Sequence, residues 1–296
     1  MEMNARCIAC LIKKQDEKIR KESDEKKKLS YMKEVLHILG NSKDEETMPW
    51  LSNQIDALYA KTFPHAVLPY AAIKKHYNDM MCAKEADIRK QIQCKEDALA
   101  YAIQLARVGN YIDFGAMSDV NEKKLNELLE NCFQITFEPK ELENFRTEVL
   151  HAKKLVYITD NAGEIVLDGI FLTVLKKLNA SLDICVIVRG VPVLNDATYA
   201  DAQKVGLTEL VRVIPNGTDV PGTPLNEVSE EALEEIEHAD LCIAKGQGNF
   251  ETLHGCGRNI YYLFLCKCQL FVKKFGVERF APILSNEKRI VQYDQK

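Results

Sequence analysis

The chain has 296 residues, of which 46% are hydrophobic and 28% charged, and its formal net charge is -5. This composition is typical of a folded globular protein with one large or two modest domains, and it excludes extensive disorder. A Lys/Arg-rich face, an apolar run of membrane-spanning length and the apolar core of a signal peptide are all missing from the sequence. We therefore expect a cytoplasmic protein that binds neither nucleic acid nor membranes, whereas the oligomeric state stays open.

The first half of the chain, residues 1–150, has the pattern of helices. Apolar side chains in residues 5–40 recur mostly at steps of three and four, which predicts one or two amphipathic helices ending at Gly40. Further helices are predicted for residues 84–108 and 121–132. Because no strand pattern occurs here, we expect residues 1–150 to form an all-helical portion.

Cys7 and Cys10 form a CxxC pair inside the first predicted helix. A second CxxC or a CxxH, which would complete a four-ligand zinc site, is absent from the sequence. Three interpretations stay open: structural thiols, part of a metal site with a distant Cys or His, or redox chemistry. The other eight cysteines are scattered, and reduced thiols are expected in a chain without secretory signals.

The segment GNYIDFG, residues 109–115, interrupts the helical half. Asn110 and Asp113 in it could reach into a cleft. Equally, the segment could be only a helix C-cap and its loop.

The second half, residues 151–296, alternates short apolar runs with helical stretches, which predicts a largely parallel sheet covered on both faces, an α/β/α arrangement. The predicted strands are residues 155–159, 184–188, 210–214 and 241–244. The predicted helices are residues 166–179, 201–205, 229–238 and 269–275.

A polar cluster follows each predicted strand. The clusters are DNAGE at 160–164, NDAT at 195–198, NGTD at 216–219 and KGQGNFE at 245–251. Because ligands bind at the carboxyl ends of strands in open α/β sheets, we expect these clusters to lie near one another.

Asp160, Asn161 and Asp196 supply the hard oxygen atoms that Mg²⁺ or Mn²⁺ prefers. The alternative is that each merely caps the helix that follows it. A second carboxylate on a neighbouring strand end weakens that alternative, because two uncompensated carboxylates repel each other. Lys245, with a glycine-rich turn at Gly246, suits an anionic group such as phosphate.

In combination, these motifs resemble the metal-dependent damage-control phosphatase family, also called the acidic-residue methyltransferase-like or protein-glutamate O-methyltransferase-like family, in its compact prokaryotic branch. The resemblance rests on the N-terminal CxxC, GNYIDFG, DNAGE, NDAT, KGQGNFE and the Lys267-Cys268 pair. Gln269 stands where the family pattern has proline. The resemblance implies a helical portion beside an α/β/α portion, a divalent ion held by Asp160, Asn161 and Asp196, and hydrolysis of phosphomonoesters of small metabolites.

The expected function is thus that of a phosphatase using Mg²⁺, Mn²⁺, Ni²⁺ or Co²⁺ on a small phosphorylated metabolite, with the native metal and substrate open. The expected catalytic residues are Asp160, Asp196 and Lys245. The expected substrate-binding residues are Asn110, Glu164, Lys245, Gly246 and Asn249. Two alternatives stay open, an S-adenosylmethionine-dependent carboxyl methyltransferase and a noncatalytic metal- or nucleotide-binding module.

Overall fold

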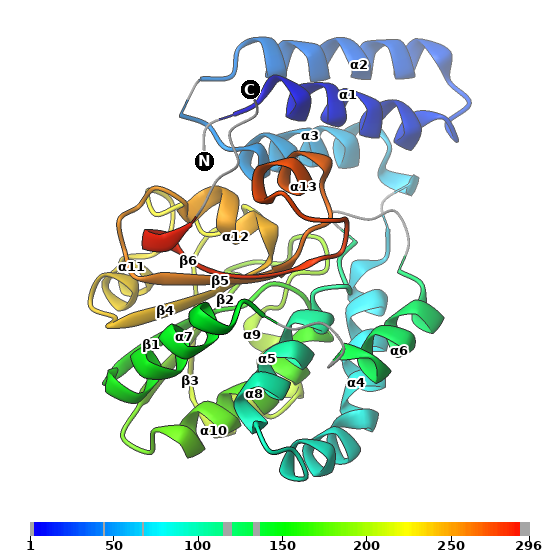
Figure 1. Ribbon diagram of the computed structural model, residues 1–296. Coiled ribbons are helices and arrows are strands. Elements are labelled where there is room, and N and C mark those ends of the chain that lie inside the picture. The colour runs from blue at the N-terminus through cyan, green and yellow to red at the C-terminus, as the bar shows by residue number, and fades with distance from the viewer. Residues whose placement is uncertain (1–2, 44, 67, 115–119, 133–136, 291–296) are drawn as a thin grey trace. The chain divides into compact units, whose positions relative to one another are not determined.

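The computed structural model describes residues 3–43, 45–66, 68–114, 120–132 and 137–290 (Figure 1). The chain divides into two compact units, Met1–Pro69 and Tyr70–Lys296. The change expected near residue 150 is a change of secondary structure within the second unit. The helices that precede residue 150 in this unit share one hydrophobic core with the sheet, so the division into units lies at residue 69.

The first unit is helical. It consists of α1 (Ala5–Ile19), α2 (Glu25–Gly40), α3 (Met48–Thr62) and the short η1 (Pro64–Ala66). The predicted helical stretch 5–40 is two helices, because Asp24 accepts hydrogen bonds from the backbone N–H groups of Lys26 and Lys27 and so caps a new helix. Cys7 is half-buried and Cys10 is exposed.

As far as its residues are described, the second unit begins with the helices α4 (Tyr70–Gln93), α5 (Ala98–Gly109), α6 (Glu122–Glu130) and α7 (Pro139–His151). The prediction of one helix over residues 84–108 was wrong. Asp97 accepts a 3.0 Å hydrogen bond from the N–H of Ala100, which starts α5 as a separate helix. Among the described residues of the first half there is no strand, as expected.

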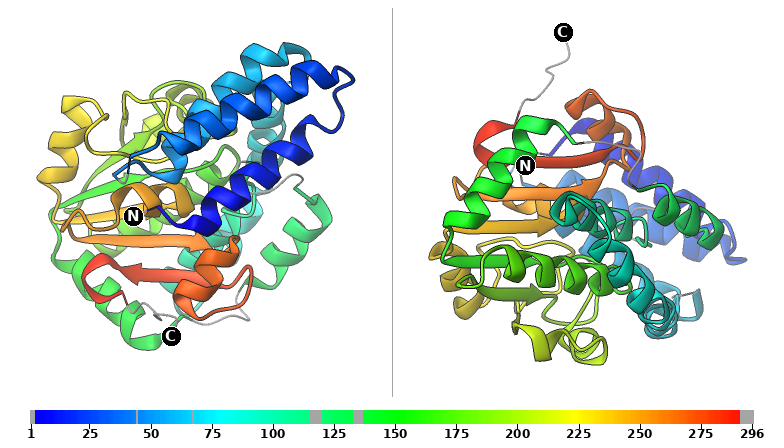
Figure 2. Two further views of the ribbon diagram at one scale, coloured as in Figure 1. Left: turned by 90° about the horizontal axis from the view of Figure 1, so that it is seen from above. Right: turned by 60° about the horizontal axis from the view of Figure 1, so that its bottom comes forward.

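One six-stranded sheet forms the centre of this unit (Figures 1 and 2). Its strands are β1 (Lys154–Ile158), β2 (Asp183–Val188), β3 (Arg212–Pro215), β4 (Leu241–Lys245), β5 (Ile260–Leu265) and β6 (Pro282–Asn286). The order is β3-β2-β1-β4-β5-β6, and only β6 is antiparallel to its neighbour. The chain therefore reverses its direction of winding between β1 and β4, which is where sheets of this order bind ligands.

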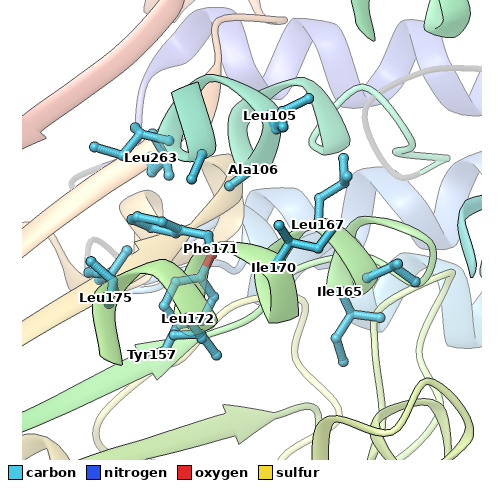
Figure 3. Close-up of a cluster of buried hydrophobic side chains, with 14 of the residues drawn as sticks. Leu105, Ala106, Tyr157, Ile165, Leu167, Ile170, Phe171, Leu172, Leu175 and Leu263 are labelled. Atoms are coloured by element: carbon cyan, nitrogen blue, oxygen red, sulfur yellow. The ribbon is translucent and has the colours of Figure 1, made fainter. Parts of the chain in front are cut away.

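Helices cover both faces of the sheet. The remaining ones are α8 (Glu164–Leu178), α9 (Tyr199–Lys204), α10 (Leu207–Leu210), α11 (Glu230–Glu237), α12 (Gly246–Leu253), α13 (Gln269–Phe275) and η3 (Glu287–Arg289). Tyr157 of β1 meets Phe171 of α8 on one face, where α5 also packs (Figure 3). Tyr262 of β5 meets Phe250 of α12 on the other. The predicted three-layer α/β/α fold with a largely parallel sheet is confirmed.

The α5–α8 layer is held by apolar packing that the sequence pattern of α8 requires. Leu167, Ile170, Phe171 and Leu172 are all fully buried, so α8 is apolar around most of its circumference (Figure 3). A helix of that kind must be covered on two sides, here by α5 and by the sheet. None of the described helices has the length and apolar character needed to cross a membrane.

Candidate active site at the carboxyl ends of β1, β2 and β4

The loops that follow β1 and β2 lie against each other. Asn161 and Asp196 form an antiparallel β-bridge. The N–H of Ala197 donates to the carbonyl of Asp160 at 2.8 Å, and the N–H of Ala162 donates to the carbonyl of Asn195 at 2.8 Å. The three residues expected to bind metal are thus brought to adjoining loops at one edge of the sheet.

Two amides and two carboxylates form a tight group at this edge. Asn110 Nδ2 donates to Asp160 Oδ2 at 2.9 Å and to Glu164 Oε2 at 3.2 Å. Asn161 Nδ2 donates to the same two oxygens at 2.7 and 3.0 Å. Asn110, at the C-terminus of α5, also accepts from the N–H of Leu265 through Oδ1, so its side chain is fixed at both ends. Asn110 therefore holds the carboxylates in place.

The carboxylates carry unfavourable negative charge. Burial raises the pKa of Asp160 well above its usual range, and the neighbouring charges of Glu164, Asp113 and Asp196 raise it further, while Lys267 opposes them. Burial likewise raises the pKa of Asp196, although the adjacent Arg189 counteracts it. Carboxyl groups in such surroundings gain stability when a cation binds among them.

Glycine is required where β4 passes this group. Gly246, the first residue of α12, has a φ of 80°, a left-handed conformation that disfavours other residues. A Cβ atom there would overlap the carboxylate of Asp160. The absence of a side chain at residue 246 thus makes room for the carboxylate of Asp160. From the sequence, this glycine turn was expected to suit an anionic group such as phosphate.

Lys245 lies between two buried carboxylates, those of Glu164 and Asp168. Its side chain is fully buried, and Nζ donates to Glu164 Oε1 at 2.6 Å, Asp168 Oδ1 at 2.7 Å and the carbonyl of Ala106 at 2.8 Å. These three bonds use all three hydrogens of the ammonium group. The expected contact of Lys245 with phosphate does not fit this geometry, in which Lys245 is the counter-charge of two buried carboxylates.

Asn249 is also occupied elsewhere. Its Nδ2 donates to the carbonyls of Thr159 and Lys245 at 3.0 and 2.7 Å, and its Oδ1 accepts from Thr223 at 2.7 Å. It joins the ends of β1 and β4 and is fully buried, so its expected contact with substrate does not fit either. The glycine-rich motif did not predict these interior contacts, because a sequence motif does not tell which side of a turn faces inward.

Two basic residues of the site were missed as functional groups. Arg189 follows β2 directly, and its Nε donates to Asp196 Oδ2 at 2.8 Å. Lys267 follows β5, and its Nζ donates to Asp113 Oδ2 at 2.6 Å. A signal for Arg189 was present, namely a cation at a predicted strand end. Lys267 stood in the Lys267-Cys268 pair of the family resemblance, but no role was expected for it because β5 was not predicted. Asp113 lies at the site, in agreement with the first of the two interpretations given for the GNYIDFG segment. Gly115 of that segment lies outside the described residues.

A hard divalent cation fits this chemistry. Carboxylate and amide oxygens are its usual ligands, and a bound cation would offset the burial that raises the pKa of Asp160 and of Asp196. Within the described residues, no group of three or more His, Cys, Asp or Glu side chains is arranged to hold a metal ion. A site here would therefore depend on the amide of Asn161 together with the two aspartates.

Comparison with known proteins places these features in context. Residues 3–283 match the damage-control phosphatase ARMT1-like domain. The chain is 32% identical to a damage-control phosphatase of Pyrococcus horikoshii, over 85% of this chain and 86% of that one. It is 31% identical to an uncharacterized protein of Methanocaldococcus jannaschii, with 94% and 93% covered. The crystal structure of a DUF89 family protein from Pyrococcus horikoshii superimposes with a TM-score of 0.81 at 28% identity, covering 97% of this chain and 99% of that one.

Proposed function

The chain belongs to the damage-control phosphatase family defined by the ARMT1-like domain, and we propose that its phosphatase activity requires a divalent metal ion and acts on phosphomonoesters of small metabolites. One observation carries the proposal. Asp113, Asp160, Glu164 and Asp196 converge where the winding of the sheet reverses, with Lys267 and Arg189 beside them. A phosphate dianion would be repelled by these carboxylates unless a cation lay between them.

In this proposal Asp160, Asn161 and Asp196 hold the metal. A divalent cation bound there would supply positive charge to the phosphoryl group as its ester bond breaks. Asn110 and Asn161 fix the carboxylate of Asp160 through the hydrogen bonds described above, and Glu164 accepts from the same two amides. Mg²⁺, Mn²⁺, Ni²⁺ and Co²⁺ are all compatible with these ligands.

Lys267 is assigned to the phosphate in place of Lys245. Its ammonium group pairs with Asp113 Oδ2 at 2.6 Å and is close enough to Asp160 to lower the pKa of that carboxyl group. Lysine binds phosphate as a compact point charge. Arg189 is assigned to Asp196, whose carboxylate it orients and partly neutralises.

The test is hydrolysis of a generic phosphomonoester, then of a panel of phosphorylated metabolites, with each of the four metals and with chelator alone. We expect turnover only with metal. Asp196→Asn should lower kcat/KM by at least about 100-fold, because a metal ligand loses its charge. Asp183→Asn, at the exposed start of β2, is the matched control and should retain full activity. Equal turnover in chelator would refute the metal requirement, and full activity of Asp196→Asn would remove this residue from the site.

A further inference from the structure

A buried polar group on α4 connects the two loops that carry the expected metal ligands. Asn78 is fully buried and belongs to none of the motifs that the sequence analysis singled out. Its Oδ1 accepts from the N–H of Gly163 at 2.6 Å, and its Nδ2 donates to Asp201 Oδ1 at 2.9 Å. One side chain thus contacts the turn after β1 and the helix after β2.

Asp201 extends this connection to the loop after β2. Its Oδ2 accepts from the N–H and the hydroxyl of Thr198, at 2.8 and 2.6 Å, and pairs with Lys74 Nζ at 2.6 Å. Lys74 is also a residue of α4, one turn before Asn78. We call Lys74, Asn78 and Asp201 the α4 clamp.

The clamp acts at the far ends of the two loops. The backbone bridge joins them at Asn161 and Asp196, and the clamp joins them again two residues further along each loop, at Gly163 and Thr198. Contacts at two points along the loops fix the orientation of one loop relative to the other, whereas a contact at one point would let the loops rotate about it.

From these contacts we infer that the α4 clamp positions Asp160 and Asn161 relative to Asp196, so that the three form one metal site. The inference rests on the proposed function, since it concerns the same ligands. Lys74, Asn78 and Asp201 are positioning residues that do not touch metal or substrate. Partners of this kind typically change metal affinity about 10–100-fold when they are removed.

The α4 helix packs closely against the turn that follows β1. A Cβ atom on Gly163 would lie 2.8 Å from Tyr77 Cβ, so α4 and the turn are in direct contact there. Gly163 has a φ of 80° and its N–H points at Asn78. A buried N–H must be paired, and Asn78 supplies the acceptor that this unusual turn needs.

The test measures the affinity of the metal-free protein for Mn²⁺ alone, by titration, beside the thermal midpoint Tm. We expect Asn78→Ala to bind Mn²⁺ about 10–100-fold more weakly. The matched control is Asn179→Ala. Asn179 is also buried, and its Nδ2 donates to the carbonyls of Val149 and Ala152 away from the site. It should lower Tm and leave the affinity for Mn²⁺ unchanged.

A reciprocal exchange tests the direction of the hydrogen bond. Asn78→Asp alone sets two carboxylates against each other and should weaken Mn²⁺ binding. Combining it with Asp201→Asn keeps the net charge and restores a hydrogen bond of opposite polarity, so the double variant should regain affinity over Asn78→Asp.

The outcomes separate the two proposals. Wild-type protein that binds no Mn²⁺ would overturn the proposed function and the clamp with it. Wild-type binding with unchanged affinity in both Asn78→Ala and Asn78→Asp would overturn the clamp alone. An equal loss of affinity in Asn179→Ala would also overturn it, because general destabilisation would then account for the effect.

Discussion

Replacing Lys245 with methionine tests whether this lysine is a structural counter-charge. The substitution keeps an unbranched side chain but leaves Glu164 and Asp168 without their counter-charge in a fully buried position. Removing one partner of a buried ion pair costs about 3–5 kcal/mol of folding free energy. For a unit of this size 1 kcal/mol corresponds to about 2–4 °C, so Tm should fall by about 6–20 °C.

A second substitution separates this cause from lost packing. Asp168→Asn in the Lys245→Met background removes one of the two stranded charges, so the double variant should be more stable than Lys245→Met alone. The assay is thermal unfolding of the wild-type protein, Lys245→Met, Asp168→Asn and the double variant. Inhibition by inorganic phosphate is then compared between the wild-type protein and folded Lys245→Met. If Lys245→Met changed Tm by less than about 2 °C and weakened inhibition by phosphate, the role of Lys245 as a structural counter-charge would be refuted. A direct contact of Lys245 with phosphate would then be the better explanation.

Three further predictions concern the site and the CxxC pair. Gly246→Ala forces the Asp160 carboxylate to move and should lower kcat/KM about 100-fold, measured with saturating metal; unchanged activity would mean that the turn yields instead. The folded-state pKa of Asp160 lies above the unfolded value of about 3.9, so the folded protein binds more protons than the unfolded protein. The stability of the metal-free protein should therefore fall as pH rises from about 4 through the raised pKa. The pH dependence of Tm in chelator should therefore be shallower in Asp160→Asn, and a steeper one would contradict the sign. Changing Cys7 and Cys10 together to serine should cost under about 1 kcal/mol and spare turnover, since Cys10 is exposed; zinc lost together with activity would show a metal-stabilised unit.

The sequence was most informative where strand runs end in polar residues. Asp160, Asn161 and Asp196 follow buried strands, and the parallel topology places them together as expected. β5, in contrast, is a continuous apolar run whose pattern does not distinguish a buried strand from a buried helix. With that strand unrecognised, Lys267 had no predicted place in the sheet.

Tertiary packing determined the rest. Lys245 and Asn249 belong to a motif that indicates phosphate binding, yet both side chains face the interior. There Lys245 pairs with Glu164, and Asn249 accepts a hydrogen bond from Thr223. Asn78 lies in the middle of a helix with no local signal. Its importance follows only from the approach of α4 to Gly163, which joins residues 85 positions apart in the chain.

The order in which the sheet is wound determines when the site can exist during synthesis. The residues of the cluster extend from Asn110 to Lys267, and β4 inserts beside β1 only after β2 and β3 have been made. Contacts of such sequence separation form late, because closing long loops is entropically costly. A nascent chain that ends before β4 thus carries Asp160 and Asp196 without the turn at Gly246 against which Asp160 is seated. The cation binding proposed above is therefore expected to follow folding of the second unit rather than to initiate it.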